Sequence, residues 1–116
     1  MTLEGTLEAD VSTDGVDDTV AFEFTVTNAG STPEELQFAD AAKAEFVVED
    51  EGREVWRYTD GRAFAQMISS ERLAPDETAT YGAEWPDPIP GDYTAVAQLR
   101  ARETSCEART DFTVPE

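Results

Sequence analysis

Apolar and polar residues alternate with a period of two along much of this chain. Residues 3–11 and 20–27 show the pattern most clearly, with apolar residues at alternate positions and mostly threonine or carboxylates between them. Because successive side chains of a β-strand point to opposite faces, each segment is predicted to be a strand with one face in the core and one in water. Asp14-Gly15, between the two segments, is typical of a hairpin turn.

Shorter stretches with the same alternation follow through the rest of the chain. The predicted strands lie at residues 36–38, 46–48, 53–58, 79–85, 93–101 and 105–114. Turn signals such as Glu51-Gly52 and the segment PDPIPGD separate them, and no long helical periodicity is present. About eight or nine short strands with such frequent turns are typical of an antiparallel β-sandwich. Residues 1–116 are long enough to bury the core of one domain, and we expect a single all-β domain.

The charge of the chain departs furthest from an average protein. It carries 26 Asp and Glu against 8 Lys and Arg, a net charge of −18, and Lys43 is its only lysine. A surface of that sign repels nucleic acid and anionic membranes, so both are excluded as partners. At molar salt the screening length falls to roughly 3 Å, which removes most of the self-repulsion. The composition therefore predicts a halophilic, salt-adapted protein, the alternative being an acidic protein from an ordinary cell.

The residues needed for most enzyme chemistry are missing from the sequence. It has no histidine, which excludes Ser-His and Cys-His nucleophiles and histidine metal sites. Cys106 is the only cysteine, so there is neither an internal disulfide nor a cysteine metal site. With 26 carboxylates on a small surface, a pair of them has no diagnostic value. We predict no enzyme activity, no catalytic, cofactor-binding or metal-binding residues, and no cofactor. No apolar run is as long as a signal sequence or a membrane span, and we expect a cytoplasmic protein.

The segment WRYTDGRAFAQMISSERLAP, residues 56–75, allows two interpretations. Trp56 and Tyr58 share one face of a predicted strand, where packing in the core is the default. If residues 64–68 are extended, Phe64 and its i+2 and i+4 neighbours face one side, which favours a strand buried on that side. The alternative is an exposed loop after the turn at Asp60-Gly61, with Phe64 and Met67 as anchors of a protein interface.

Four segments of the chain resemble the intracellular proteinase inhibitor family of the BsuPI type. They are EFTVTNAGSTPEELQF, EFVVEDEGREVWRYTDGRAFAQ, ERLAPDETATYGAEW and PGDYTAVA, which together reach from about Phe22 to Ala97. The most specific residues, in family order and at nearly family spacing, are Trp56, Asp60-Gly61, Phe64, Gln66, Leu73-Ala74-Pro75, Tyr81, Trp85 and Pro90-Gly91-Asp92-Tyr93. Two features depart from the family: Asp76 stands where glycine is usual, and the connector between Trp85 and Tyr93 is short.

The resemblance implies an immunoglobulin-like β-sandwich that inhibits an intracellular subtilisin-like serine protease. Inhibition of that kind would use a preorganised loop that blocks the substrate cleft of the protease. We expect Phe64 and Met67 to be the apolar contacts with the protease, Arg62 to be a contact at the rim, and Trp56 to support the loop from beneath.

The other interpretation is a non-catalytic immunoglobulin-like structural or interaction module without inhibitory activity. Such a module could pair an edge strand with another protein, or form a homodimer through the apolar residues 64–68. An inhibitor should leave Phe64 or Met67 largely exposed on a loop, whereas a structural module should bury both.

Overall fold

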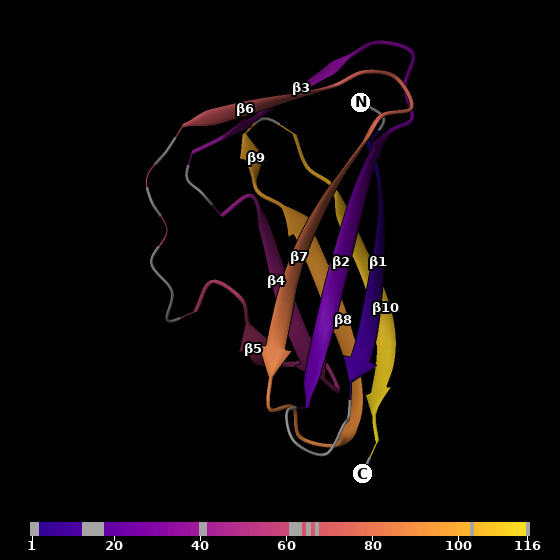
Figure 1. Ribbon diagram of the computed structural model, residues 1–116, viewed down its shortest axis with the longest axis vertical. Helices are drawn as coiled ribbons and strands as arrows, with labels where there is room; N and C mark the ends of the chain where they lie inside the picture. The colour runs from indigo at the N-terminus through magenta and orange to yellow at the C-terminus, as the bar shows by residue number, and fades with distance from the viewer. Residues whose placement is uncertain are drawn as a thin grey trace.

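A computed structural model describes residues 3–12, 18–39, 42–60, 64, 66, 68–102 and 104–115. These residues form ten β-strands and no helix, and every paired set of strands is antiparallel (Figure 1). The strands are β1 Leu3–Ser12, β2 Thr19–Asn28, β3 Glu34–Phe38, β4 Ala44–Asp50, β5 Arg53–Arg57, β6 Ser69–Leu73, β7 Thr78–Pro86, β8 Gly91–Leu99, β9 Ala101–Arg102 and β10 Glu107–Val114. The prediction of an all-β antiparallel sandwich is confirmed.

The strands are divided among three sheets. One layer has the order β1-β2-β7, and the layer behind it has the order β10-β8-β4-β5 (Figure 1). A small third sheet, β6-β3-β9, closes the end of the sandwich drawn at the top of Figure 1. β1 and β2 pair from Leu3 opposite Asn28 to Ser12 opposite Thr19, as a hairpin requires. The predicted turn residues Asp14-Gly15 lie outside the described residues.

The core lies between the two larger sheets and is rich in aromatic rings. Alternation along β2 buries Val20, Phe22, Phe24 and Val26, of which none is more than 3% exposed. The ring of Phe22 lies 6.2 Å from that of Phe46 and 6.0 Å from that of Trp56, measured between centroids. These contacts join the two layers, because Phe22 belongs to the first sheet and Phe46 and Trp56 to the second.

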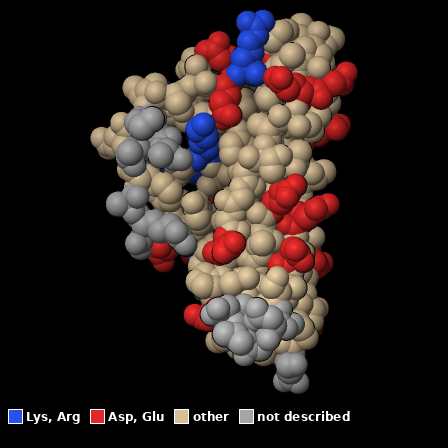
Figure 2. All heavy atoms as spheres, viewed as in Figure 1, with Lys and Arg blue, Asp and Glu red and all other residues tan. Residues whose placement is uncertain are grey.

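The outer face of the β1-β2-β7 sheet is polar and carries many carboxylates. Red side chains are spread along this face in Figure 2. The exposed carboxylates of the three strands are Glu4, Glu8, Asp10, Glu23 and Glu84. The alternation that builds the core therefore also determines where part of the negative charge lies. Within the described ranges, no helix is long and apolar enough to cross a membrane.

Candidate functional site: the connection between β5 and β6

The described residues between β5 and β6 belong to a loop. Phe64, Gln66 and Ile68 lie in no strand, and Ile68 is 82% exposed. The prediction of a half-buried strand over residues 64–68 is therefore wrong at these three positions. The reason is topological: β5 is the edge of the four-stranded sheet and β6 belongs to the small sheet, so the connecting chain crosses from one sheet to the other. Arg62 and Met67 lie outside the described residues.

Phe64 packs on an aromatic side chain that is itself attached to the core. Its ring centroid lies 5.8 Å from that of Tyr58, and Phe64 is half-buried, so it shows neither the full exposure expected of an inhibitor contact nor the burial expected of a structural module. The ring of Tyr58 lies 5.9 Å from Phe46 and 6.4 Å from Trp56. Trp56 also stacks on Trp85 at 6.3 Å. A continuous row of rings therefore leads from the core to the loop, with Tyr58 between Phe64 and Trp56.

The start of the loop is bound to a buried carboxylate. Glu45 in β4 is only 7% exposed, although it lies on the outer face of its sheet. Its carboxylate accepts hydrogen bonds from the backbone N–H of Thr59 at 3.3 Å, from the Thr59 hydroxyl, and from Nη1 of Arg57 at 3.2 Å. It also accepts one from the N–H of Phe46 at 3.0 Å. A buried carboxyl group with this many donors has its hydrogen-bonding capacity satisfied, so it fixes the position of Thr59.

Arg57 connects this carboxylate to a second one at the surface. Its Nη2 lies 2.7 Å from Oε1 of Glu54. The hydrogen bond to Glu54, followed by that to Glu45, raises the pKa of the Arg57 guanidinium. The same contact with Arg57 lowers the pKa of the Glu54 carboxyl. Each of these two shifts favours the charged form, so the contact between Arg57 and Glu54 is an ion pair.

The end of the loop is held by a second ion pair. Glu71 in β6 lies 3.4 Å from Nζ of Lys43 and accepts a hydrogen bond of 3.2 Å from the Tyr81 hydroxyl. Nζ of Lys43 also lies 5.5 Å from the ring centroid of Phe38. Burial, and then the negative charge of Glu71, raises the pKa of Tyr81. The only lysine of the chain thus attaches β6 to the residue directly before β4.

A buried asparagine attaches the far end of β6 to β2. Asn28 has no exposed surface, and its side-chain Nδ2 donates to the carbonyls of Thr32 at 2.8 Å and Leu73 at 3.0 Å. Its Oδ1 accepts a hydrogen bond of 2.9 Å from the N–H of Gly30. The backbone carbonyl of Asn28 accepts one from Asp76, whose φ of 69° lies in the left-handed region. Asp76 stands where the resemblance leads one to expect glycine, and aspartate is a residue type that tolerates this conformation.

Several residues of this site were not predicted from the sequence. They are Glu45, Glu71, Asn28 and the exposed Ile68. Alternation predicts that Glu45 points toward water. Its burial could not be predicted, because it depends on Arg57 and Thr59, which lie beyond the next hairpin. The single lysine was a signal that could have directed attention to Glu71.

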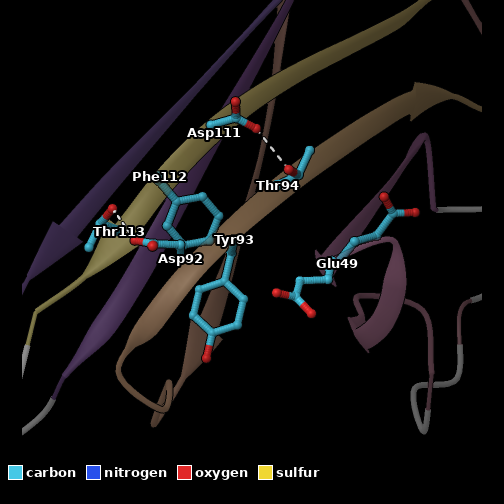
Figure 3. A pocket seen from close by; sticks show the side chains of 8 residues that line it. Glu49, Asp92, Tyr93, Thr94, Asp111, Phe112 and Thr113 are labelled. Carbon is cyan, nitrogen blue, oxygen red and sulfur yellow. Dashed lines mark hydrogen bonds between the residues drawn. The ribbon is translucent and has the colours of Figure 1, made fainter.

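A hollow lies on the outer face of the four-stranded sheet. It has a volume of about 400 Å³ and is lined by several carboxylates, including Glu49, Asp92 and Asp111 (Figure 3). Asp111 accepts a hydrogen bond from Thr94 at 2.7 Å, and Asp92 accepts one from Thr113 at 2.8 Å. In the part of the chain that the structure describes, no group of three His, Cys, Asp or Glu residues is arranged to hold a metal ion.

Comparison with known proteins supplies the family. The family model described as "Intracellular proteinase inhibitor", BsuPI, matches residues 7–104, which include the whole connection between β5 and β6. The chain belongs to the BsuPI family. The resemblance found in the sequence is therefore confirmed, and the BsuPI match reaches from β1 to the residues just after β9. No curated protein sequence matches this chain.

Solved structures support the fold of this BsuPI protein. A Bordetella pertussis protein described as ApaA superimposes with a TM-score of 0.56 and 19% sequence identity, covering 97% of this chain and 92% of the other. A calcium-binding mutant of Bacteroides uniformis beta-glucuronidase 2 superimposes with a TM-score of 0.52 and 13% identity. That match covers 98% of this chain but only 14% of the glucuronidase chain. At these identities the likeness concerns the fold alone.

Proposed function

We propose that this BsuPI protein inhibits a subtilisin-like serine protease by placing the connection between β5 and β6 against the substrate cleft. The observation that carries the proposal is that both ends of this connection are attached to the sandwich. Glu45 holds its start through Thr59, and Glu71 and Asn28 hold the strand that follows. A loop whose two ends are fixed before binding loses less conformational entropy in the complex than one with free ends, which increases affinity and slows dissociation.

The side chains of the connection have the chemistry of protease contacts. We assign Phe64 and Met67 as the apolar contacts and Arg62 as a contact at the rim of the cleft. Large apolar side chains at the centre of an interface typically supply most of its binding energy. Trp56 would support the loop through Tyr58, on which Phe64 packs. The exposed Ile68 adds a third apolar side chain to this set.

The charge of the chain suggests where the complex forms. We infer that inhibitor and protease meet in a salt-rich cytoplasm, because the net charge of −18 is tolerable where salt screens it and the family is described as intracellular. The protease would then be salt-tolerant as well.

The test is a titration of a salt-tolerant subtilisin-like protease with this protein in molar KCl, following hydrolysis of a peptide substrate. We expect stoichiometric loss of activity for the wild type, and inhibition constants raised roughly tenfold or more for Phe64→Ala and for Met67→Ala. Val55→Ala is the matched control, because it truncates an apolar side chain that is 46% exposed on β5, outside the connection.

Unchanged protease activity at a large excess of folded, uncut protein would contradict the inhibitor proposal. That result would favour the non-inhibitory interaction module. Equal inhibition constants for Phe64→Ala, Met67→Ala and Val55→Ala would be compatible with inhibition but would show that the protease contacts a surface other than this connection.

A further inference from the structure

Ile89 is a second exposed apolar side chain, far along the chain from the site above. It lies in the connection between β7 and β8 and is 72% exposed. Isolated apolar residues are common on protein surfaces, so exposure alone indicates nothing. The way in which the backbone holds Ile89 distinguishes it.

The backbone around Ile89 is held rigidly at several points. Pro88 and Pro90 flank it, which fixes two φ angles, and Pro88 is buried. The hydroxyl of Tyr93 donates a hydrogen bond to the carbonyl oxygen of Ile89, and the N–H of Asp87 donates one of 3.1 Å to the carbonyl of Asp18. Little conformational entropy is left for this loop to lose on binding.

Tyr93 is in turn fixed by the core. Its ring lies 5.0 Å from that of Trp85 and 5.6 Å from that of Phe112, between centroids, and the residue is 9% exposed. In Figure 3 the rings of Tyr93 and Phe112 lie close together. The hydroxyl that holds the Ile89 carbonyl therefore comes from a side chain that cannot move freely.

The direction of this carbonyl excludes one mode of binding. A peptide bond that a serine protease attacks must place its carbonyl oxygen in the oxyanion hole of the enzyme. The Ile89 carbonyl is directed to Tyr93 instead, and Pro90 after it has no N–H. Ile89 is therefore presented as a side chain and not as a bond to be cut.

The residues next to Ile89 favour one kind of partner surface. Asp87 and Asp92 are exposed on either side of it along the chain. A partner pocket that accepts Ile89 would have an apolar interior, and a rim of arginine or lysine would complement the two carboxylates, whereas an acidic rim would repel them. The partner that family membership supplies is a proteinase.

We propose that Ile89 docks into an apolar pocket with a cationic rim on the same protease, outside its catalytic cleft. This inference rests on the proposed function. The β7–β8 loop is then a second contact, and it increases affinity by slowing dissociation.

The experiment compares wild type, Ile89→Ala and Val55→Ala in molar KCl. Each is measured for its inhibition constant and for its affinity for the same protease with its cleft occupied by a covalent peptidyl chloromethyl ketone. We expect Ile89→Ala to raise the inhibition constant roughly tenfold and to abolish the residual binding to the blocked protease, with Val55→Ala like wild type. Tyr93→Phe, which frees the carbonyl of Ile89, should fall between them.

The two proposals fail in different ways. If Ile89→Ala inhibits the protease as strongly as the wild type does, the docking of Ile89 is overturned and the proposed function remains. Absence of inhibition by the wild type would overturn the proposed function and this inference with it. Thermal unfolding of each variant in the same buffer verifies that the comparison is made between folded proteins.

Discussion

Thr59 donates two hydrogen bonds to the carboxylate of Glu45, one from its backbone N–H at 3.3 Å and one from its hydroxyl. The two residues are fourteen positions apart, on either side of the β4–β5 hairpin. This contact buries a carboxylate on the outer face of a sheet and fixes the first residues of the connection between β5 and β6. It is the strongest link between the fold of this protein and its proposed activity.

Replacement of Glu45 by glutamine should weaken both the fold and the inhibition. The amide has one acceptor oxygen instead of two and no charge, so a buried donor of Thr59 or Arg57 loses its partner. We expect the free energy of unfolding to fall by about 2–3 kcal/mol, measured by urea unfolding at constant KCl. Glu54→Gln is the control, since Glu54 pairs with the same arginine at the exposed surface and should have a much smaller effect. Equal losses in the two variants would show that burial of Glu45 is not what matters.

Stability should depend on salt through particular pairs of like charges. Glu8 in β1 lies directly opposite Glu23 in β2 on the outer face of the first sheet. Like charges in such positions destabilise a sheet by about 0.2–1 kcal/mol, and this repulsion is screened at molar salt. We therefore expect the melting temperature of the wild type to rise steeply with KCl, and Glu23→Gln to be more stable than wild type only at low salt.

Glu4→Gln is the matched control for this pair, because Glu4 lies opposite Thr27 and not opposite a carboxylate. It should change the low-salt melting temperature less than Glu23→Gln does. A wild-type melting temperature that is the same in dilute buffer and in molar KCl would refute the salt adaptation.

Gly5 in β1 should not tolerate a side chain. A Cβ at this position would lie 2.9 Å from Sγ of Cys106, 2.9 Å from Cε1 of Phe24 and 3.3 Å from the carbonyl oxygen of Glu107. Overpacking of this kind costs about 1–3 kcal/mol, so Gly5→Ala should lower the free energy of unfolding by that amount. Cys106→Ala removes one of the clashing atoms, and the double variant should lose less than the sum of the two single losses. Additive losses in urea unfolding would contradict the contact between Gly5 and Cys106.

The raised pKa of Tyr81 predicts that the free energy of unfolding falls at alkaline pH. Burial and the neighbouring Glu71 raise its pKa in the folded protein, so the folded state favours the neutral phenol. The associated stabilisation is complete below the ordinary pKa of about 10 and is lost as the pH rises toward the raised value. Urea unfolding above about pH 10 should therefore show a steeper loss of stability for wild type than for Tyr81→Phe.

Two other groups with raised pKa values contribute to the pH dependence of both proteins and cancel when the two are compared. Tyr93 and Cys106 also have pKa values raised by burial, and both remain in Tyr81→Phe. Only the difference between the two proteins therefore reports on Tyr81. Parallel pH profiles for wild type and Tyr81→Phe would refute the assignment.

The alternation in the sequence determined the class of fold and most of the core. Successive residues of a strand point to opposite faces whatever the neighbouring strands are, so the burial of every second residue from Val20 to Val26 followed directly from the pattern. The same holds for the shared inner face of Ala79, Tyr81, Ala83 and Trp85 in β7. The charge, the missing histidines and the family resemblance also required no structure.

The tertiary structure decided the features on which the proposed activity depends. Residues 64–68 alternate like a strand, but strands need a neighbour for their backbone, and this segment connects two different sheets. Glu45 is placed toward water by its own strand, and it is buried only because Arg57 and Thr59 return to it. Lys43 meets Glu71 across a long stretch of sequence. Such contacts depend on which strands become neighbours, which local patterns do not specify.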